Sequence, residues 1–327
     1  MNKKTTYCHI QSLWNFVIFI ILLNKNKFDP NVKYIIIYER DIIPLHFKKE
    51  FKDILEFKLL NSAFKKINFL YYLKKNNKEN NSVIKFLNYS NFGQLICGLR
   101  RYDSITFIDD GSTFINSNSP SISYESLLRN KIKKILSFKN FQPDFMNFHS
   151  VDKAYIFNND LFDFKKDENS FQLIELNKII SMNDFINISD KIIPNIESLK
   201  EFNCETLVLG AALVEHGFLT SSIYNENLLD ILKTNKNILF KPHPSESNAH
   251  IKNVNFLPND FNKYPVELLI NIIKPKKVIS FGSTTSFLLM NMKLNIELEI
   301  YFPKKLMSKK LELIFKKLQD RINIYYI

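Results

Sequence analysis

A pair of adjacent carboxylates, Asp109 and Asp110, follows a short apolar run at 104–108 and precedes Gly111. Open α/β sheets bind ligands at the carboxyl ends of their strands, where a carboxylate can act as general base on a hydroxyl group. Adjacent side chains of an extended segment point to opposite faces, so we expect only one of the two to enter a site. An Asp-Asp-Gly surface turn is the competing interpretation, and the motif alone favours it.

A histidine between two prolines is the second candidate, and it follows an apolar run at 238–240. In the motif Lys241-Pro242-His243-Pro244, the prolines fix φ on both sides of His243 and stiffen its backbone, which suits a side chain that must be aimed. Such a histidine can donate a hydrogen bond or a proton to a leaving phosphate, and Lys241 adds positive charge nearby. A rigid loop with an exposed histidine fits the motif equally well.

Hydroxyl groups between an expected strand and an expected helix form the third candidate. Gly282, Ser283, Thr284 and Thr285 offer hydroxyls and backbone N–H groups at a helix N-terminus, a combination that binds phosphate. The alternative is an ordinary Ser/Thr helix cap. Glu267, at the start of another helix, can hold ribose hydroxyls or merely interact favourably with the helix dipole.

The segment 210–217 follows an expected strand at 206–209 and holds two further polar candidates, Glu215 and His216. Either can line a site, or the segment is a plain connecting loop. The remaining histidines lack metal-ligand spacing, and no HExxH, Walker A, GxGxxG or GxSxG motif occurs. We therefore expect no metal, no cofactor and no Ser-His-Asp hydrolase.

The elements that must position these residues alternate between strand and helix. Strands are expected at 5–10, 32–38, 104–108, 154–157, 171–176, 206–209, 238–240, 254–257, 277–280 and 296–301. Helices are expected at 11–23, 44–60, 62–75, 83–99, 225–234, 266–273, 283–293 and 307–318. This alternation, with no 20–50-residue repeat, predicts two Rossmann-like α/β domains that bind ligands at the carboxyl ends of their strands.

The chain length also suggests two domains, at about 150 residues per domain. We place the domains at 1–190 and 191–327, with the junction inside 178–203. The apolar run at 13–23 is too short to span a bilayer, and no small-residue cleavage site follows it. We therefore expect a buried helix there, rather than a membrane anchor or a signal peptide.

Composition narrows the class of partner. The formal net charge is +12, and lysine supplies all but five of the 45 basic residues. An AT-rich genome would explain the lysine bias, whereas attraction to an anionic nucleotide or membrane surface would explain the charge. Base reading favours arginine and no nucleic-acid-binding motif occurs, so we expect no nucleic-acid partner. Three widely spaced cysteines argue against a disulfide framework and favour the cytoplasm.

Taken in order, the candidate motifs resemble those of the bacterial sialyltransferases. The acidic-acidic-Gly, His-Pro and Ser-Ser/Thr motifs of those enzymes correspond here to Asp109-Asp110-Gly111, Lys241-Pro242-His243-Pro244 and Ser283-Thr284-Thr285. The Pro-x-Glu-Leu-Leu sequence at Glu267 also matches. The segments at 7–10 and 209–219 resemble the family 52 glycosyltransferases, which include lipooligosaccharide sialyltransferases and share motifs with capsular polysialyltransferases. The resemblance spans most of the chain through short motifs.

This resemblance implies the GT-B fold, with two Rossmann-like domains facing a central cleft. The domain at 1–190 would lie on the acceptor side, and the domain at 191–327 would bind CMP. The implied reaction is an inverting, metal-independent transfer of sialic acid from CMP-sialic acid to a sugar hydroxyl of a lipooligosaccharide or capsular glycan. The partners would then be a nucleotide-sugar donor and a glycan acceptor.

The resemblance also implies roles for single residues. Asp110, beside Asp109, would be the base, His243 would bind and protonate the leaving phosphate, and Glu267 would hold the ribose. The other donor-binding residues would be Lys241, Pro244, Gly282, Ser283, Thr284 and Thr285. Relatives often have Gln-Pro where this chain has Ala211-Ala212, and an acidic residue where it has His216. If the base comes from that segment, Glu215 would serve and Asp110 would be structural.

Two other functions remain open from the sequence. The same fold can use another nucleotide sugar, or the chain can be a non-catalytic nucleotide-binding or membrane-surface protein. Lysine-rich segments such as 130–139 can bring a cytoplasmic enzyme to the anionic inner membrane as a peripheral protein. The acceptor, the linkage and the oligomeric state are not determined, with a homodimer as one option.

Overall fold

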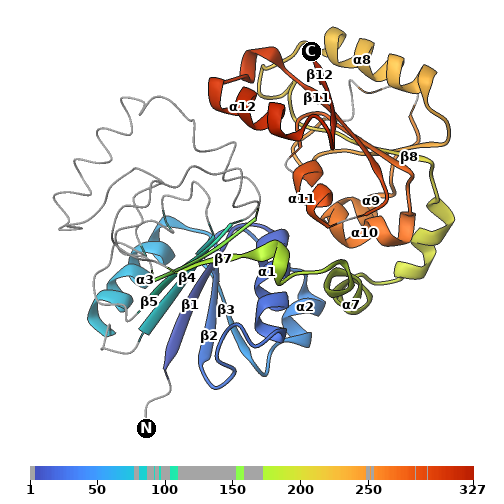
Figure 1. The fold of residues 1–327 in the computed structure, drawn as a ribbon. Coiled ribbons are helices and arrows are strands. Elements are labelled where there is room, and N and C mark those ends of the chain that lie inside the picture. The colour runs from blue at the N-terminus through green and yellow to red at the C-terminus, as the bar shows by residue number, and fades with distance from the viewer. Residues whose placement is uncertain are drawn as a thin grey trace. The chain divides into compact units, whose positions relative to one another are not determined.

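The protein consists of two compact units, Met1–Ile180 and Ser181–Ile327 (Figure 1). The computed structural model describes residues 4–76, 81–86, 92, 96, 104–109, 152–157, 172–247, 251, 254–283, 285–292 and 294–327. The division between the units therefore precedes helix α7 (Met182–Ile192), whereas the sequence-based division at 190 follows most of it.

The first unit is built on a parallel sheet with strand order β3-β2-β1-β4-β5-β6-β7. Its strands are β1 (Thr5–Ile10), β2 (Lys33–Tyr38), β3 (Leu55–Leu59), β4 (Asn81–Phe86), β5 (Ser104–Ile108), β6 (Lys153–Ile156) and β7 (Gln172–Glu175). The centre of the sheet is apolar on both faces, as in strands Tyr34–Tyr38 and Tyr7–Ile10, where nearly every side chain is buried.

Three helices of the first unit frame this sheet: α1 (Leu13–Asn24), α2 (Leu45–Glu50) and α3 (Ala63–Asn76). Figure 1 shows α3 against one face and α1 and α2 against the other. The Ser12 hydroxyl starts α1 by accepting a hydrogen bond from the Asn15 N–H at 3.1 Å. Residues Phe16–Leu22 of α1 are fully buried, which confirms the expected buried helix. Within the described residues, no helix has the length and apolarity needed to cross a bilayer.

Two expected helices of the first unit are wrong in part. The segment 44–60 forms α2 only as far as Glu50 and then β3, in which apolar residues alternate with Glu56 and Lys58. The segment 83–99 begins inside β4, a buried strand between β1 and β5. A short apolar run does not distinguish a buried strand from a buried helix, and here the pairing partners decided.

The second unit is built on a smaller parallel sheet with strand order β12-β11-β10-β8-β9. Its strands are β8 (Thr206–Leu209), β9 (Ile238–Lys241), β10 (Lys277–Ser280), β11 (Glu297–Phe302) and β12 (Asn323–Tyr326). The first four match the expected strands closely, whereas β12 was not expected. The segment expected to follow β9 as a strand contributes only a bridge, from Phe256 to Phe240.

The helices of the second unit are α7, α8 (Ser221–Thr234), α9 (Asn259–Asn262), α10 (Val266–Ile273), α11 (Thr285–Asn291) and α12 (Lys309–Leu318). Short 3-10 turns lie at Ile196–Phe202 and Lys304–Leu306, and a third, Leu176–Lys178, lies at the end of the first unit. Helix α8 packs through Tyr224, Leu228 and Ile231 against the sheet. Helix α10 contacts both α7 and α11, and Phe287 of α11 stacks on Phe315 of α12. These contacts give the second unit its own core.

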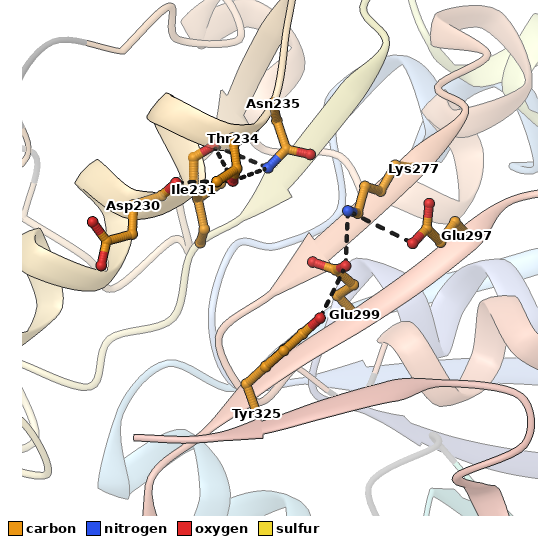
Figure 2. A network of polar contacts seen from close by, with 8 residues as sticks. All are labelled: Asp230, Ile231, Thr234, Asn235, Lys277, Glu297, Glu299 and Tyr325. Atoms are coloured by element: carbon orange, nitrogen blue, oxygen red, sulfur yellow. Dashed lines mark hydrogen bonds and ion pairs between the residues drawn. The ribbon is translucent and has the colours of Figure 1, made fainter.

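A charged network holds the amino-terminal ends of β10 and β11 together (Figure 2). Lys277 Nζ lies 2.7 Å from Glu299 Oε1 and 3.6 Å from Glu297 Oε1, while the Tyr325 hydroxyl reaches Glu299 at 3.5 Å. Burial opposes the charge on Lys277, but the ion pair with Glu299 leaves its pKa raised. This network fastens β12 to the sheet at the edge opposite the one where the candidate residues lie.

Candidate active site

The loops after β8, β9 and β10 lie at one edge of the second sheet, because these three strands are parallel neighbours. Most of the donor-side residues predicted from the sequence follow these strands. The loop after β8 carries Glu215 and His216, the loop after β9 carries His243 and Pro244, and the turn after β10 carries Gly282 and Ser283. The fold therefore gathers three motifs, separated by up to 70 residues, at the edge where open α/β sheets bind ligands.

Glu246 links two of these loops, and the sequence analysis did not identify it. Its carboxylate accepts hydrogen bonds from the Tyr224 hydroxyl at 2.6 Å and from the His243 backbone N–H at 2.9 Å. The Ala211 backbone amide also hydrogen-bonds to it. Burial, reinforced by the nearby Glu215 charge, raises the pKa of the Glu246 carboxyl to about 7. Glu246 thus anchors the backbone of His243 to the loop after β8.

Gly210 leaves the space that the Glu246 carboxylate occupies. A Cβ atom on Gly210 would stand 2.0 Å from Glu246 Oε2 and 2.8 Å from Phe240 Cζ. The Phe240 ring is completely buried and has little room to move. Glycine is needed at this position because the carboxylate approaches the backbone closely, rather than because of a special φ angle.

The His243 ring is oriented by its own loop. Its Nδ1 atom accepts the Ser245 backbone N–H at 3.1 Å, so the neutral imidazole carries its proton on Nε2. The surrounding protein partly desolvates the exposed His243 ring and so lowers its pKa, and the positive charges of Lys241 and His216 lower it further, although Glu215 acts in the opposite sense. At neutral pH this ring is therefore uncharged, and its Nε2–H can donate a hydrogen bond.

Glu215 is exposed at the same edge and accepts a hydrogen bond from the Ser247 backbone N–H. Its negative charge also acts to raise the pKa of both His243 and Glu246. The structure therefore brings Glu215, His216 and His243 together. Of the two base candidates from the sequence, Glu215 stands in this cluster, whereas Asp110 lies outside the described residues.

Two predicted residues, Lys241 and Glu267, are buried at this end of the sheet, and the half-buried Thr285 contacts Glu267. Lys241 Nζ donates to the Asn262 carbonyl oxygen at 2.8 Å, and Glu267 shares a side-chain hydrogen bond with Thr285. The charges of Lys241 and Glu267 attract each other. Burial lowers the pKa of Lys241 to about 8 and raises the pKa of the Glu267 carboxyl.

The burial of Glu267 and Lys241 affects the roles expected for them. Glu267 is 4% exposed and Lys241 is 8% exposed, so both side chains support the loops from inside. In this arrangement the Glu267 carboxylate holds the first turn of α11 through Thr285, and does not present itself to a ribose at the surface.

The strand-to-helix turn after β10 is held by hydroxyl groups. Ser280 Oγ and Ser286 Oγ are buried and lie 2.7 Å apart, and Ser283 Oγ accepts the Thr285 N–H at 3.3 Å. Gly282 has φ of +70°, the left-handed conformation that favours glycine. Ser283 therefore caps its own turn, and Thr284 lies outside the described residues.

Asp109 has a structural partner in the first unit. It is 1% exposed, its Oδ2 atom accepts the Phe157 N–H at 3.1 Å, and its N–H donates to the Tyr155 carbonyl oxygen at 2.8 Å. The carboxylate therefore joins the end of β5 to the end of β6. This agrees with the expectation that only one carboxylate of the pair can enter a site.

A second polar cluster lies at the carboxyl ends of β1 and β2 in the first unit. The buried His9 places Nε2 3.2 Å from Glu39 Oε1, and Lys66 of α3 forms an ion pair with the other oxygen of Glu39. The Phe92 ring meets His9 edge-on at 6.0 Å. The sequence analysis included His9 only as part of the segment 7–10, which resembles the family 52 glycosyltransferases. Across the described residues, no group of His, Cys, Asp and Glu side chains has the geometry of a metal site.

No protein-family model matches the sequence, and no curated protein matches it significantly. Solved structures do match. A Photobacterium damselae sialyltransferase, represented by its GT-B domain, has a TM-score of 0.61 at 13% identity, covering 99% of this chain and 100% of that one. The Photobacterium sp. JT-ISH-224 2,6-sialyltransferase, solved with CMP and lactose, has a TM-score of 0.60 at 14% identity, covering 98% and 78%.

A plant enzyme extends the comparison. Phytolacca americana UGT2, solved with UDP-2-fluoro-glucose and pterostilbene, has a TM-score of 0.52 at 10% identity, covering 99% of this chain and 86% of that one. With two parallel α/β units matched along nearly its whole length, the chain has the GT-B fold of these glycosyltransferases.

Proposed function

We propose that this protein is a glycosyltransferase of the sialyltransferase type, similar to the family 52 enzymes, that transfers sialic acid from CMP-sialic acid to a glycan hydroxyl. The observation that carries the proposal is the arrangement of His243 at the carboxyl edge of the second sheet. Its ring is aimed by Ser245, its backbone is anchored by Glu246, and Glu215 and His216 are its neighbours. The fold shared with an enzyme solved with CMP and lactose supports this assignment.

In the proposed reaction, an acceptor hydroxyl attacks the anomeric carbon of sialic acid while the bond to the CMP phosphate breaks. The hydroxyl proton passes to a carboxylate, and negative charge develops on the leaving phosphate. The neutral His243 donates its Nε2–H to that phosphate, a hydrogen bond that strengthens as charge develops. Because the pKa of His243 is lowered, the neutral imidazole is favoured over the imidazolium, and His243 acts by donating a hydrogen bond.

The identity of the base is open between two carboxylates. Asp110 is the choice that the acidic-acidic-Gly motif supports, and Glu215 is the choice that proximity to His243 supports. Replacing the true base should lower kcat far more than it raises KM, because proton removal matters mainly in the transition state. Comparing Asp110→Asn with Glu215→Gln therefore decides between them.

The central experiment measures CMP binding and CMP-sialic acid turnover with a panel of galactosides. His243→Ala should lower kcat by about 10²-fold, because a donor aimed at developing charge is lost. His46→Ala, on α2 of the first unit, is the matched control and should leave turnover unchanged. Absence of binding by both CMP and CMP-sialic acid at millimolar concentration would contradict the proposal. Turnover should also survive EDTA, because protein groups alone would stabilise the leaving phosphate.

A second candidate is a transferase that uses another nucleotide sugar. The match to a plant enzyme solved with a UDP-sugar analogue favours it, since one GT-B fold accommodates different nucleotides. Competition among CMP, UDP and GDP for the same site separates the two candidates. A non-catalytic nucleotide-binding protein would bind a nucleotide without turning over any donor.

The proposed setting is the cytoplasm, with a lipooligosaccharide or capsular glycan as acceptor. Cys8 and Cys204 are buried free thiols, which is compatible with a reducing compartment. Products formed on lactose, lipooligosaccharide cores and sialylated oligomers would identify the acceptor class and distinguish addition of one residue from polymerisation.

A further inference from the structure

Helix α3 has one face that is buried against the sheet and an opposite face that is exposed. Phe69 and Leu73, four residues apart, are buried in the cluster formed with Tyr7, Ile35 and Ile37 of the sheet. Because residues at this spacing share one side of a helix, the opposite side of α3 points away from the sheet.

That opposite side carries large apolar side chains. Phe64 is 73% exposed, Ile67 is 64% exposed and Tyr71 is 67% exposed. Spacings of three and four residues place the three in a single row along the helix. Isolated exposed apolar residues are normal on protein surfaces, but a continuous row on one helix face marks an interaction surface.

The charges that α3 itself carries all have one sign. The sequence of α3 contains four lysines and no acidic residue. Lys66 is paired with Glu39, whereas the exposed Lys74 and Lys75 follow Tyr71 in the last turn. The outer face of α3, defined here as Phe64, Ile67, Tyr71, Lys74 and Lys75, is therefore apolar along its middle and positively charged at its C-terminal end.

We propose that the outer face of α3 binds an anionic membrane surface, with the helix lying in the plane of the headgroups. An apolar row with lysines at its border is the pattern of interfacial helices, in which apolar side chains enter the acyl boundary and lysines meet anionic lipids. Tyr71 suits this depth, because its ring is apolar and its hydroxyl is polar.

A second copy of the chain fits this surface less well. A two-fold contact between outer faces would bring the lysines of one α3 toward those of the other, since such interfaces pair the same patch with itself. The chain also carries a net charge of +12, so its self-association is opposed electrostatically. An anionic lipid surface satisfies both the apolar row and the charges.

Vesicle co-sedimentation of the full chain tests the proposal without any assay of activity. The protein should bind vesicles of phosphatidylglycerol mixed with phosphatidylcholine, bind phosphatidylcholine alone far less, and dissociate at high salt. The triple variant Phe64→Ser/Ile67→Ser/Tyr71→Ser should bind the anionic vesicles at least about tenfold more weakly. Lys74→Gln/Lys75→Gln should weaken that binding about tenfold and leave residual binding to neutral vesicles unchanged.

Matched controls come from other helices. The variant Ile223→Ser/Leu229→Ser/Leu313→Ser removes three exposed apolar side chains from α8 and α12, with exposures of 41%, 42% and 61%. It should bind vesicles as the wild type does. Thermal unfolding of each variant checks that the fold survives, which is expected because every replaced side chain points outward.

A spectroscopic measurement locates the contact. The chain has one tryptophan, Trp14, so Tyr71→Trp adds a second emitter on the outer face of α3. Anionic vesicles should shift its emission to the blue, and Leu313→Trp on α12 should show no shift. Equal vesicle binding by the wild type and the α3 triple variant would overturn the proposal. So would a dimer in sedimentation that the triple variant abolishes, because a second copy would then occupy this face.

Discussion

At the scale of single residues, the candidate site depends on a carboxyl group that no motif search would select. Glu246 accepts the His243 N–H, while the Glu246 N–H donates back to the His243 carbonyl oxygen at 2.9 Å. The first of these bonds is the half of a helix capping box in which an acidic fourth residue accepts the N–H of the first, and the second is an ordinary backbone turn bond. The spacing His243-x-x-Glu246 was the available signal, but it becomes meaningful only once Tyr224 and Gly210 are seen to enclose the carboxylate.

The raised pKa of Glu246 predicts how stability changes with pH. The folded protein binds this proton more tightly than the unfolded chain, in which the pKa is near 4.5. Protonation of Glu246 therefore stabilises the fold. This stabilisation is complete below pH 4.5 and is lost as the pH rises through about 7. The Glu246→Gln variant resembles the protonated acid at every pH. The free energy of unfolding of the variant minus that of the wild type should therefore increase by up to about 3 kcal/mol between pH 4.5 and pH 8.

Urea unfolding of both proteins across this range measures the effect. The matched control is Glu226→Gln, which replaces an exposed carboxylate of α8. A constant difference for Glu246→Gln would mean that the Glu246 carboxyl titrates normally in the folded protein.

At the scale of elements, close contacts between loops decide where His243 stands. Gly210→Ala should destabilise the fold by about 1–3 kcal/mol, because the added methyl group enters the space of the Glu246 carboxylate. In a Glu246→Ala background that cost should fall by at least about 1 kcal/mol, since the two positions are coupled. The measurement is a double-mutant cycle of unfolding free energies.

Gly217 supplies the control for this cycle. It lies in open space with φ of +70°, so Gly217→Ala should cost about 1 kcal/mol through backbone strain alone. The Glu246→Ala background should leave that cost unaltered. If the costs of Gly210→Ala and Gly217→Ala respond alike to removal of the carboxylate, the proposed contact is not what makes Gly210 necessary.

Two neighbouring lysines at the start of β10 test the network of Figure 2. Lys277 pairs with Glu299, whose side chain is 7% exposed, so Lys277→Met leaves a buried charge and should cost about 3 kcal/mol. Lys276 is 80% exposed and pairs with the half-exposed Glu205, so Lys276→Met should cost far less than Lys277→Met, because solvent screens the exposed pair. Chemical denaturation compares the two, and equal costs would show that the network contributes no more than a surface pair.

At the scale of the whole molecule, the chain forms two units with separate cores, and α7 belongs to the second. Its first turn is fixed by a capping box in which the Ser181 N–H and hydroxyl both donate to Asp184. Phe185, Ile188 and Ile192 are buried, and the helix contacts α10. Helix α10 carries Glu267, so α7 supports the site from a distance.

This assignment predicts the behaviour of fragments. A fragment of residues 181–327 should fold cooperatively and retain CMP binding, because the proposed donor-side residues all lie within it. A fragment of residues 191–327 exposes the face of α10 that α7 covers, and it should lose stability or fail to fold. Circular dichroism and calorimetric CMP titration compare the two. Equal stability would place α7 outside the unit.

The α/β class, most strands of the second sheet and the motifs that follow them could be predicted from the amino-acid sequence. These features are local: a four-residue run of mostly apolar residues predicts a buried strand, and proline or glycine follows its end. For the same reason the sequence could not separate helix from strand at 44–60 and 83–99, where partners rather than periodicity decide. It also missed β12, whose short apolar pattern depends on packing against β11. Helix α7 was missed as well, although Ser181-x-x-Asp184 and the helical spacing of Phe185, Ile188 and Ile192 offered a signal.

Only the tertiary structure decided which predicted residues stand together and which face inward. It brought Glu215 and His216 to His243 and linked their loops through Glu246, but buried Glu267 with Lys241 and fixed Asp109 to the end of β6. The physical reason is that side-chain exposure and charge coupling depend on distances across the sheet. Such distances follow from strand order, and strand order is not written in any single segment of the chain.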